Sequence, residues 1–140
     1  MAERLICNQN VVGSIPIASS ILKLLMFPII IKNSRIPKII SWFMYVKAIT
    51  LWPFIIFRDE GNELTIRHES IHIKQQTELL VIFFYILYAY DFVVGLIKHR
   101  DFFKAYTNIR FEQEAYQNQA DKEYLSNRER WAWTKYSLFE

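Results

Sequence analysis

The spacing of two histidines is the feature that most constrains this chain. Residues 68–72 read HESIH, so histidines stand at positions 68 and 72 and a glutamate directly follows the first. In an α-helix, residues four apart lie one turn apart on the same face. Both imidazoles can then reach one Zn²⁺ ion at about 2.0–2.1 Å. We therefore expect a helix that carries His68 and His72 as metal ligands, with Glu69 beside the metal as a general base and acid.

A catalytic zinc site also needs a third protein ligand and an open position. The remaining histidine, His99, lies between two basic residues, which is typical of a solvated side chain. Positions at which a longer histidine pattern could continue hold Gln75 and Glu78. A downstream carboxylate is the next candidate, and the segment FEQEAY supplies two of them, Glu112 and Glu114.

The pairing of HExxH with a later ExxA helix resembles the gluzincins, zinc metallopeptidases whose third ligand is a glutamate. Residues 111–116 (FEQEAY) are similar to the ExxAD helix of membrane-associated prenyl-protein-type and stress-type zinc proteases. The order of elements over about 48–136 also resembles small uncharacterised HExxH proteins of bacteria and their phages. By position, the resemblance implies that Glu112 is the ligand glutamate and that Ala115 is the motif's alanine.

Tyr116 stands where the resembled family has an aspartate. That aspartate orients a ligand histidine, a role that fixes the ring and its tautomer. Asp121 or Gln76 could substitute for it. A rotated helix would bring Glu114 rather than Glu112 to the metal, so both glutamates remain candidates.

The residues around the motif predict an α+β fold that is mainly α. Segment 48–57 is rich in β-branched and aromatic residues, as strands are. Because Pro53 cannot donate a hydrogen bond to a sheet, we expect an edge strand or a hairpin of two short strands. Three to four C-terminal helices should follow and complete a minimal zincin-like domain over 48–140. We expect these helices at about 63–77, 78–98, 109–125 and 127–136, with a polar connection over 99–108.

Residues 1–47 form an apolar N-terminal segment with scattered lysines. A short helix over about 19–27 should end at Pro28. Aromatic residues beside a lysine in 36–45 are typical of an element that contacts a membrane surface, although an ordinary core helix reads the same way. The segment therefore predicts packing on a membrane surface or on a protein partner.

The apolar stretch 79–97 is long enough to cross a bilayer. A crossing would place His72 and Glu112 on opposite sides, roughly 30 Å apart. A spanning helix and a shared metal site are therefore mutually exclusive. We expect this helix instead to double back against the motif helix as an antiparallel hairpin, with its one charge, Asp91, facing the protein or its polar edge.

Composition excludes some functions. The net charge of +3 is mild and its basic residues are scattered, so no nucleic-acid partner is expected. No signal peptide is recognised, because the N-terminal apolar run is interrupted by polar residues, Gly and Pro. The single cysteine, Cys7, fits a reducing compartment. A cytoplasmic or membrane-associated protein is the expectation.

These patterns favour a zinc-dependent metallopeptidase that hydrolyses a peptide or protein substrate. The strand before the motif could bind an extended substrate by β-addition. Two other hypotheses stay open. One is a non-catalytic structural or interaction protein of a phage or membrane assembly, with a vestigial or structural metal site. The other is a small membrane protein without a metal.

Overall fold

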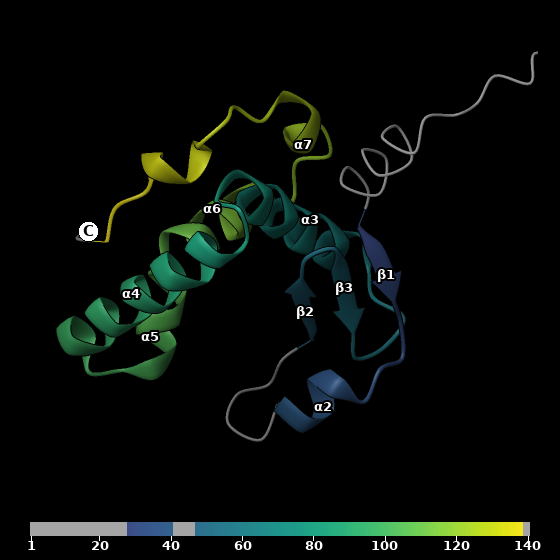
Figure 1. Cartoon of the computed structure of the whole chain (residues 1–140), viewed down its shortest axis with the longest axis horizontal. Helices are drawn as coiled ribbons and strands as arrows, with labels where there is room; N and C mark the ends of the chain where they lie inside the picture. The colour runs from purple at the N-terminus through teal and green to yellow at the C-terminus, as the bar shows by residue number, and fades with distance from the viewer. Residues whose placement is uncertain (1–27, 41–46, 139–140) are drawn as a thin grey trace, which may run out of the picture.

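The structure is a computed structural model that describes residues 28–40 and 47–138. It is mainly helical with one small sheet, so the expectation of an α+β fold that is mainly α is confirmed (Figure 1). The helix expected at 19–27, and most of the element expected at 36–45, lie outside the described residues. What is described of the latter is the short helix α2 (Ile36–Ile40).

Three short strands form the sheet in the order β1-β3-β2. They are β1 (Ile29–Ile31), β2 (Ala48–Leu51) and β3 (Phe54–Phe57). The hairpin expected over 48–57 is present: β2 runs antiparallel to β3, and Trp52 and Pro53 connect them. The N-terminal segment supplies β1, which pairs in parallel with β3. Only β2 of this hairpin is therefore an edge strand, and β3 is central.

Helix α3 (Glu63–Glu78) carries the motif and packs against the sheet. Its N-terminus is capped by Asn62, whose side chain accepts a hydrogen bond from the Thr65 amide at 2.8 Å. Its apolar contact with the sheet is a cluster of Ile55, Phe57 and Ile73, each at most 4% exposed. This packing fixes the motif face of α3 beside the edge strand β2.

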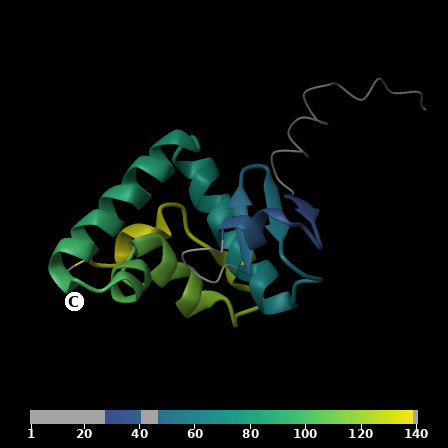
Figure 2. The same ribbon diagram turned by 90° about the horizontal axis from the view of Figure 1, so that it is seen from below.

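The chain then turns sharply into α4 (Ile82–His99). Leu80 and Val81, at the turn, have φ angles of 52° and 62°, a conformation that L-residues rarely adopt. Figure 2 shows α3 and α4 diverging as two arms of a V. The expectation that α4 would lie antiparallel to α3 is therefore wrong: α4 packs mainly against α5 (Phe102–Thr107). Gly95 makes this possible, because a Cβ there would lie 3.1 Å from Ala105 Cα.

Three expected boundaries in the C-terminal half are also wrong. The polar connection at 99–108 contains α5, which Asp101 caps by accepting a hydrogen bond from the Lys104 amide. The third helix, α6 (Arg110–Asn118), ends early rather than at 125. In place of a last helix over 127–136, the chain forms α7 (Tyr124–Asn127) and the 3₁₀ turn η1 (Ala132–Lys135). Ion pairs from Arg128 to Glu78 of α3 and to Glu114 of α6 hold this irregular segment against the helices.

A second core joins the helices. Its buried members are Leu79, Phe84, Ile109, Phe111 and Trp133. Asp91 of α4 is fully buried and pairs with Arg110 at 2.7 Å, so the expectation that it faces the protein is confirmed. This core sets α6 beside α3, which brings the two sequence motifs together.

Candidate metal centre

Helix α3 presents both motif histidines to one point. The spacing of four residues puts them on one face, and their Nε2 atoms lie 3.2 Å apart. His68 is 7% exposed and His72 is 6% exposed. Two nearly buried imidazole nitrogens that face each other so closely need a shared cation or proton between them.

Helix α6 brings Glu112 to the same point. Its Oε2 lies 3.4 Å from His68 Nε2, and its Oε1 lies 3.3 Å from His72 Nε2. The three ligand atoms lie within 4.8 Å of one another. Tyr88 of α4 donates a hydrogen bond to Glu112 Oε1 at 2.8 Å, which holds the carboxylate in place. The structure thus brings together three of the residues singled out from the sequence.

The donor set fits a zinc ion. Two histidines and one glutamate are a known ligand set of catalytic zinc sites, which keep a further position open. Glu112 Oε2 is buried and, among the described residues, its polar contact is the long one of 3.4 Å to His68 Nε2. A buried carboxylate oxygen in that condition is costly unless a cation satisfies it.

Charge couples the three groups strongly. Burial alone would lower the pKa of His72, but the Glu112 carboxylate raises it to about 9. Burial would raise the pKa of Glu112, yet attraction to His72 and hydrogen bonds from both histidines hold it well below its usual range. Without a metal, these opposed shifts favour a Glu112 carboxylate paired with a protonated His72. A metal ion competes with that proton for the same nitrogen.

Gln75 orients His72. Its Oε1 lies 2.8 Å from His72 Nδ1, so it accepts the ring N–H and leaves Nε2 free for a metal. Its Nε2 donates to the Phe111 carbonyl at 3.1 Å and to Glu114 Oε2 at 3.0 Å. The ring is thus positioned by one fully buried amide that also ties α3 to α6.

The residues proposed to replace the missing aspartate do not do so. Gln76 bonds the backbone of the edge strand, and Asp121 accepts from the Glu123 amide. Tyr116 instead packs edge-on against His68, with ring centroids 4.7 Å apart. In the sequence, Gln75 stood out only as a departure from a longer histidine pattern. Its position three residues after His72, on the same face, was the available signal.

Replacing Gln75 by leucine should weaken zinc binding. The change removes the acceptor for His72 Nδ1–H while keeping a buried side chain of similar size. Loss of such an orienting partner costs about 10–100-fold in metal affinity. The matched control is Gln76→Leu, the neighbouring buried glutamine, which should leave affinity unchanged. Competition with a chromogenic chelator measures both, and equal losses in the two variants would refute the orienting role.

Glu114 lies away from the histidines. It is fully buried and forms an ion pair with Arg128, and Tyr124 also donates a hydrogen bond to it. Of the two candidate glutamates, the one beside the motif is therefore Glu112. His99, at the C-terminal end of α4, is not part of the group either.

Glu69 occupies the side of the site nearest the sheet. It is 8% exposed, and the Thr50 hydroxyl of β2 donates a hydrogen bond to its Oε2. Gln76 fixes β2 in this position by donating to the Thr50 carbonyl at 3.2 Å and accepting from the Trp52 amide at 2.9 Å. The carboxylate that follows the first histidine is thereby held beside the metal position.

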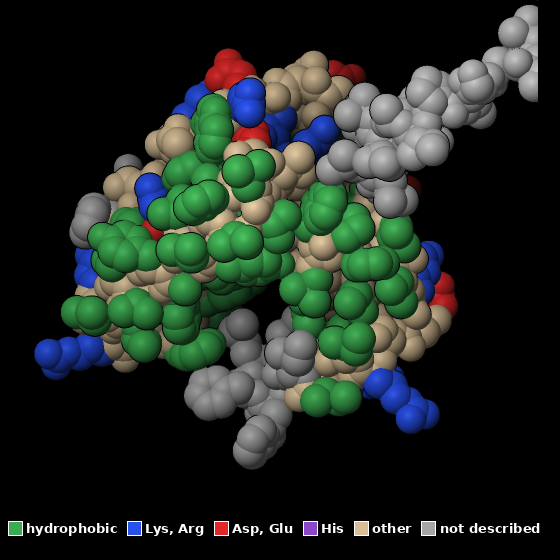
Figure 3. Space-filling view, viewed as in Figure 1, with side chains coloured by type: hydrophobic (Ala, Val, Ile, Leu, Met, Phe, Trp, Pro, Cys, Tyr) green, Lys and Arg blue, Asp and Glu red, His purple; other side chains and the backbone are tan. Residues whose placement is uncertain are grey.

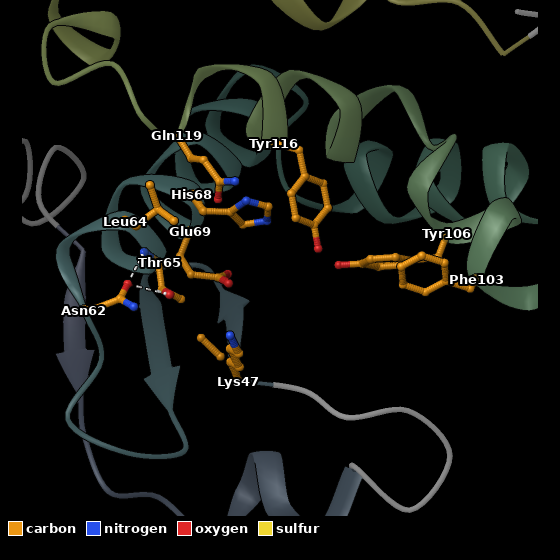
Figure 4. A pocket seen from close by; sticks show the side chains of 11 residues that line it. Lys47, Asn62, Leu64, Thr65, His68, Glu69, Phe103, Tyr106, Tyr116 and Gln119 are labelled. Atoms are coloured by element: carbon orange, nitrogen blue, oxygen red, sulfur yellow. Dashed lines mark hydrogen bonds between the residues drawn. The ribbon is translucent and has the colours of Figure 1, made fainter.

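Two adjoining cavities open beside the ligands, of about 330 and 260 Å³. Both are lined by Ala48, His68, Glu69 and Tyr106. In Figure 4 the hydroxyls of Tyr106 and Tyr116 point toward each other, and both side chains line the first cavity together with His68 and Glu69. Burial raises the pKa of both tyrosines, so each stays a hydrogen-bond donor at neutral pH. No sequence pattern identified Tyr88 or Tyr106, because they lie on separate helices.

A scan against protein-family models and searches of curated proteins and of solved structures find no match to this chain.

Proposed function

We propose that this chain is a minimal zincin-like, zinc-dependent metallopeptidase. The observation that supports this most strongly is the convergence of His68, His72 and Glu112, from two helices forty positions apart, with Glu69 at its side. A bound Zn²⁺ supplies Lewis acidity and lowers the pKa of water to about 7. The substrate would be a peptide bond in an extended segment of polypeptide.

Each side chain around the ligands has a role in this proposal. Glu69 takes a proton from the attacking water and delivers it to the leaving amine. Thr50 keeps that carboxylate aimed at the cleft through its hydroxyl. The hydroxyls of Tyr106 and Tyr116 face the open side, where they would donate to the carbonyl oxygen as it gains charge.

Side chains already bond part of the edge of β2, which limits where a substrate could pair with this strand. The Thr50 carbonyl accepts hydrogen bonds from Gln76 and from Tyr85, the latter at 3.1 Å, and the Trp52 amide donates to Gln76. The C-terminal end of β2 is therefore occupied by side chains. An extended peptide added to this edge would pair with the portion that precedes the Thr50 carbonyl, beside Glu69.

The test compares zinc-loaded wild type with Glu69→Gln on a peptide library read by mass spectrometry. The variant should keep its zinc but lose cleavage by about 10²–10⁴-fold, the usual contribution of a general acid–base group. Glu63→Gln, an exposed glutamate of the same helix that pairs with Arg67, is the control and should cleave normally. Equal cleavage by Glu69→Gln and wild type would refute the assigned role.

One observation favours the second candidate, a non-catalytic metal-binding protein. Within the part of the chain that the structure describes, His68 Nδ1 is buried without a hydrogen-bond partner, so this ring lacks the support that Gln75 gives to His72. Zinc-loaded wild type that cleaves no peptide in the library would point to this second function.

A further inference from the structure

We propose that one apolar face of this protein, centred on the mouth of the cleft, docks on the surface of an anionic lipid bilayer. Two groups of exposed apolar side chains make up this face, which we call the α4–sheet face. On α4 they are Ile82, Ile86, Tyr90, Val93 and Ile97; on the sheet they are Ile29, Ile31, Leu51 and Phe54.

The α4 group is a single helical stripe. Its members recur every three or four residues and are between 52% and 73% exposed. The opposite side of the helix is buried against the protein through Phe84, Asp91 and Gly95. By length and composition α4 could cross a membrane, and only 17% of it is buried inside the protein. A helix that is held to the protein along one side and presents an apolar stripe on the other fits the plane of a bilayer interface rather than a crossing.

The sheet group lies on the side facing away from α3. Side chains alternate along strands, and Ile55 and Phe57 point into the core with α3. Phe54 therefore faces the other way, together with its partners Ile29 and Leu51 in the neighbouring strands. These three residues are 38–44% exposed.

The two groups share one side of the molecule. Figure 3 shows apolar side chains gathered over α4 and over the sheet, with a hollow between them. Leu51 and Tyr85, which line the cavity beside the metal ligands, are themselves 44% and 39% exposed. The cleft therefore opens within the apolar face. Contiguous exposed apolar surface of this kind marks an interaction site.

The charges around the α4–sheet face favour an anionic bilayer as the surface that covers it. Residues 28–57 contain no Asp or Glu but four basic residues, and the only charge between positions 79 and 97 is the buried, paired Asp91. Exposed basic side chains lie in the elements that adjoin the two groups: Arg35 and Lys38 in and before α2, beside the sheet, and Lys98, Arg100 and Lys104 at the end of α4 and in α5 (Figure 1). A single acidic residue, Asp101, lies among the latter, and it caps α5. An apolar surface flanked by cations matches anionic headgroups above acyl chains.

A consequence follows for the substrate, and it rests on the proposed peptidase function. With its cleft facing the bilayer, the site would receive polypeptide segments that lie at the membrane surface or emerge from it. The docking itself depends on neither the metal nor the activity.

Co-sedimentation of the full chain with phosphatidylglycerol–phosphatidylcholine vesicles tests the docking. Wild type should bind these vesicles, bind pure phosphatidylcholine more weakly, and bind equally with and without zinc. Ile86→Glu and Val93→Glu should each weaken binding by about 10–100-fold, because each exchanges a side chain that enters the apolar layer for a charge. Both positions are exposed, so folding and zinc content should be unchanged.

The control adds the same charge elsewhere: Gln117→Glu on the exposed polar surface of α6 should bind as wild type does. Wild type that ignores the vesicles would overturn the proposal. In that case, a dimer that Ile86→Glu dissociates would identify a second copy as the occupant. Because zinc content is measured on the same samples, failure to dock stays distinguishable from failure of the metal site.

Discussion

Replacing Arg128 by methionine should lower the free energy of unfolding by about 3–5 kcal/mol, the usual cost of removing one partner of a buried ion pair. The Arg128 side chain is 3% exposed and bonds two carboxylates, those of Glu78 at the end of α3 and Glu114 on α6. Glu114 is fully buried. Methionine fills similar volume but leaves that carboxylate without its cation.

Urea denaturation of zinc-free protein measures the effect. The matched control is Arg130→Met, two positions along, where the guanidinium is exposed and lies 5.6 Å from the Trp131 ring centroid. An exposed contact of this kind contributes about 0.5–1 kcal/mol. If both variants unfold at the same urea concentration, Arg128 does not have the structural role assigned to it.

Replacing Glu112 by alanine should lower zinc affinity by more than about 100-fold. Loss of a partner that only orients a ligand costs about 10–100-fold, and Glu112 is itself a proposed ligand, so its loss should cost more. Its two oxygens lie 3.3 and 3.4 Å from the two histidine Nε2 atoms, and no other carboxylate belongs to the metal-binding group among the described residues. Chelator competition at fixed pH gives the affinity.

Glu114→Gln is the decisive comparison for this prediction. Glu114 is also buried on α6, but it contacts Arg128 and Gln75 rather than the motif histidines. The variant should be less stable yet bind zinc nearly as tightly as wild type. A loss of zinc in Glu114→Gln with retention in Glu112→Ala would reverse the ligand assignment.

The sequence predicted those parts of the site that depend on local spacing. Helical periodicity alone places His68 and His72 on one face. The enrichment of β-branched and aromatic residues in 48–57 predicts the hairpin. The requirement that His72 and Glu112 share one site predicted that both side chains lie at the same end of the 79–97 helix, and the two do lie together. These inferences needed no knowledge of long-range packing.

What could not be predicted depends on contacts between distant elements. Gln75 and Tyr88 support the ligands from positions that no short pattern marks, since their roles exist only once α4 and α6 pack near α3. The direction of α4 is another case. It depends on two positive φ angles at Leu80 and Val81, residues that do not favour that conformation locally. Tertiary packing outweighed local propensity there.

The exposed apolar side of α4 should make the protein prone to aggregate in water. A stripe of isoleucine, valine and tyrosine around the cleft mouth is an aggregation hazard in water unless something covers it. If the bilayer is that cover, adding anionic vesicles should suppress aggregation at protein concentrations where the vesicle-free chain associates.

If His68, His72 and Glu112 form one metal site, the metal content of the purified chain should depend on these residues. Wild-type protein and His72→Ala are incubated with Zn²⁺, freed of unbound metal by gel filtration, and analysed by inductively coupled plasma mass spectrometry. The site predicts one zinc ion per wild-type chain and none in His72→Ala. Wild-type protein that emerges without zinc, or a variant that retains it in full, would contradict the assignment.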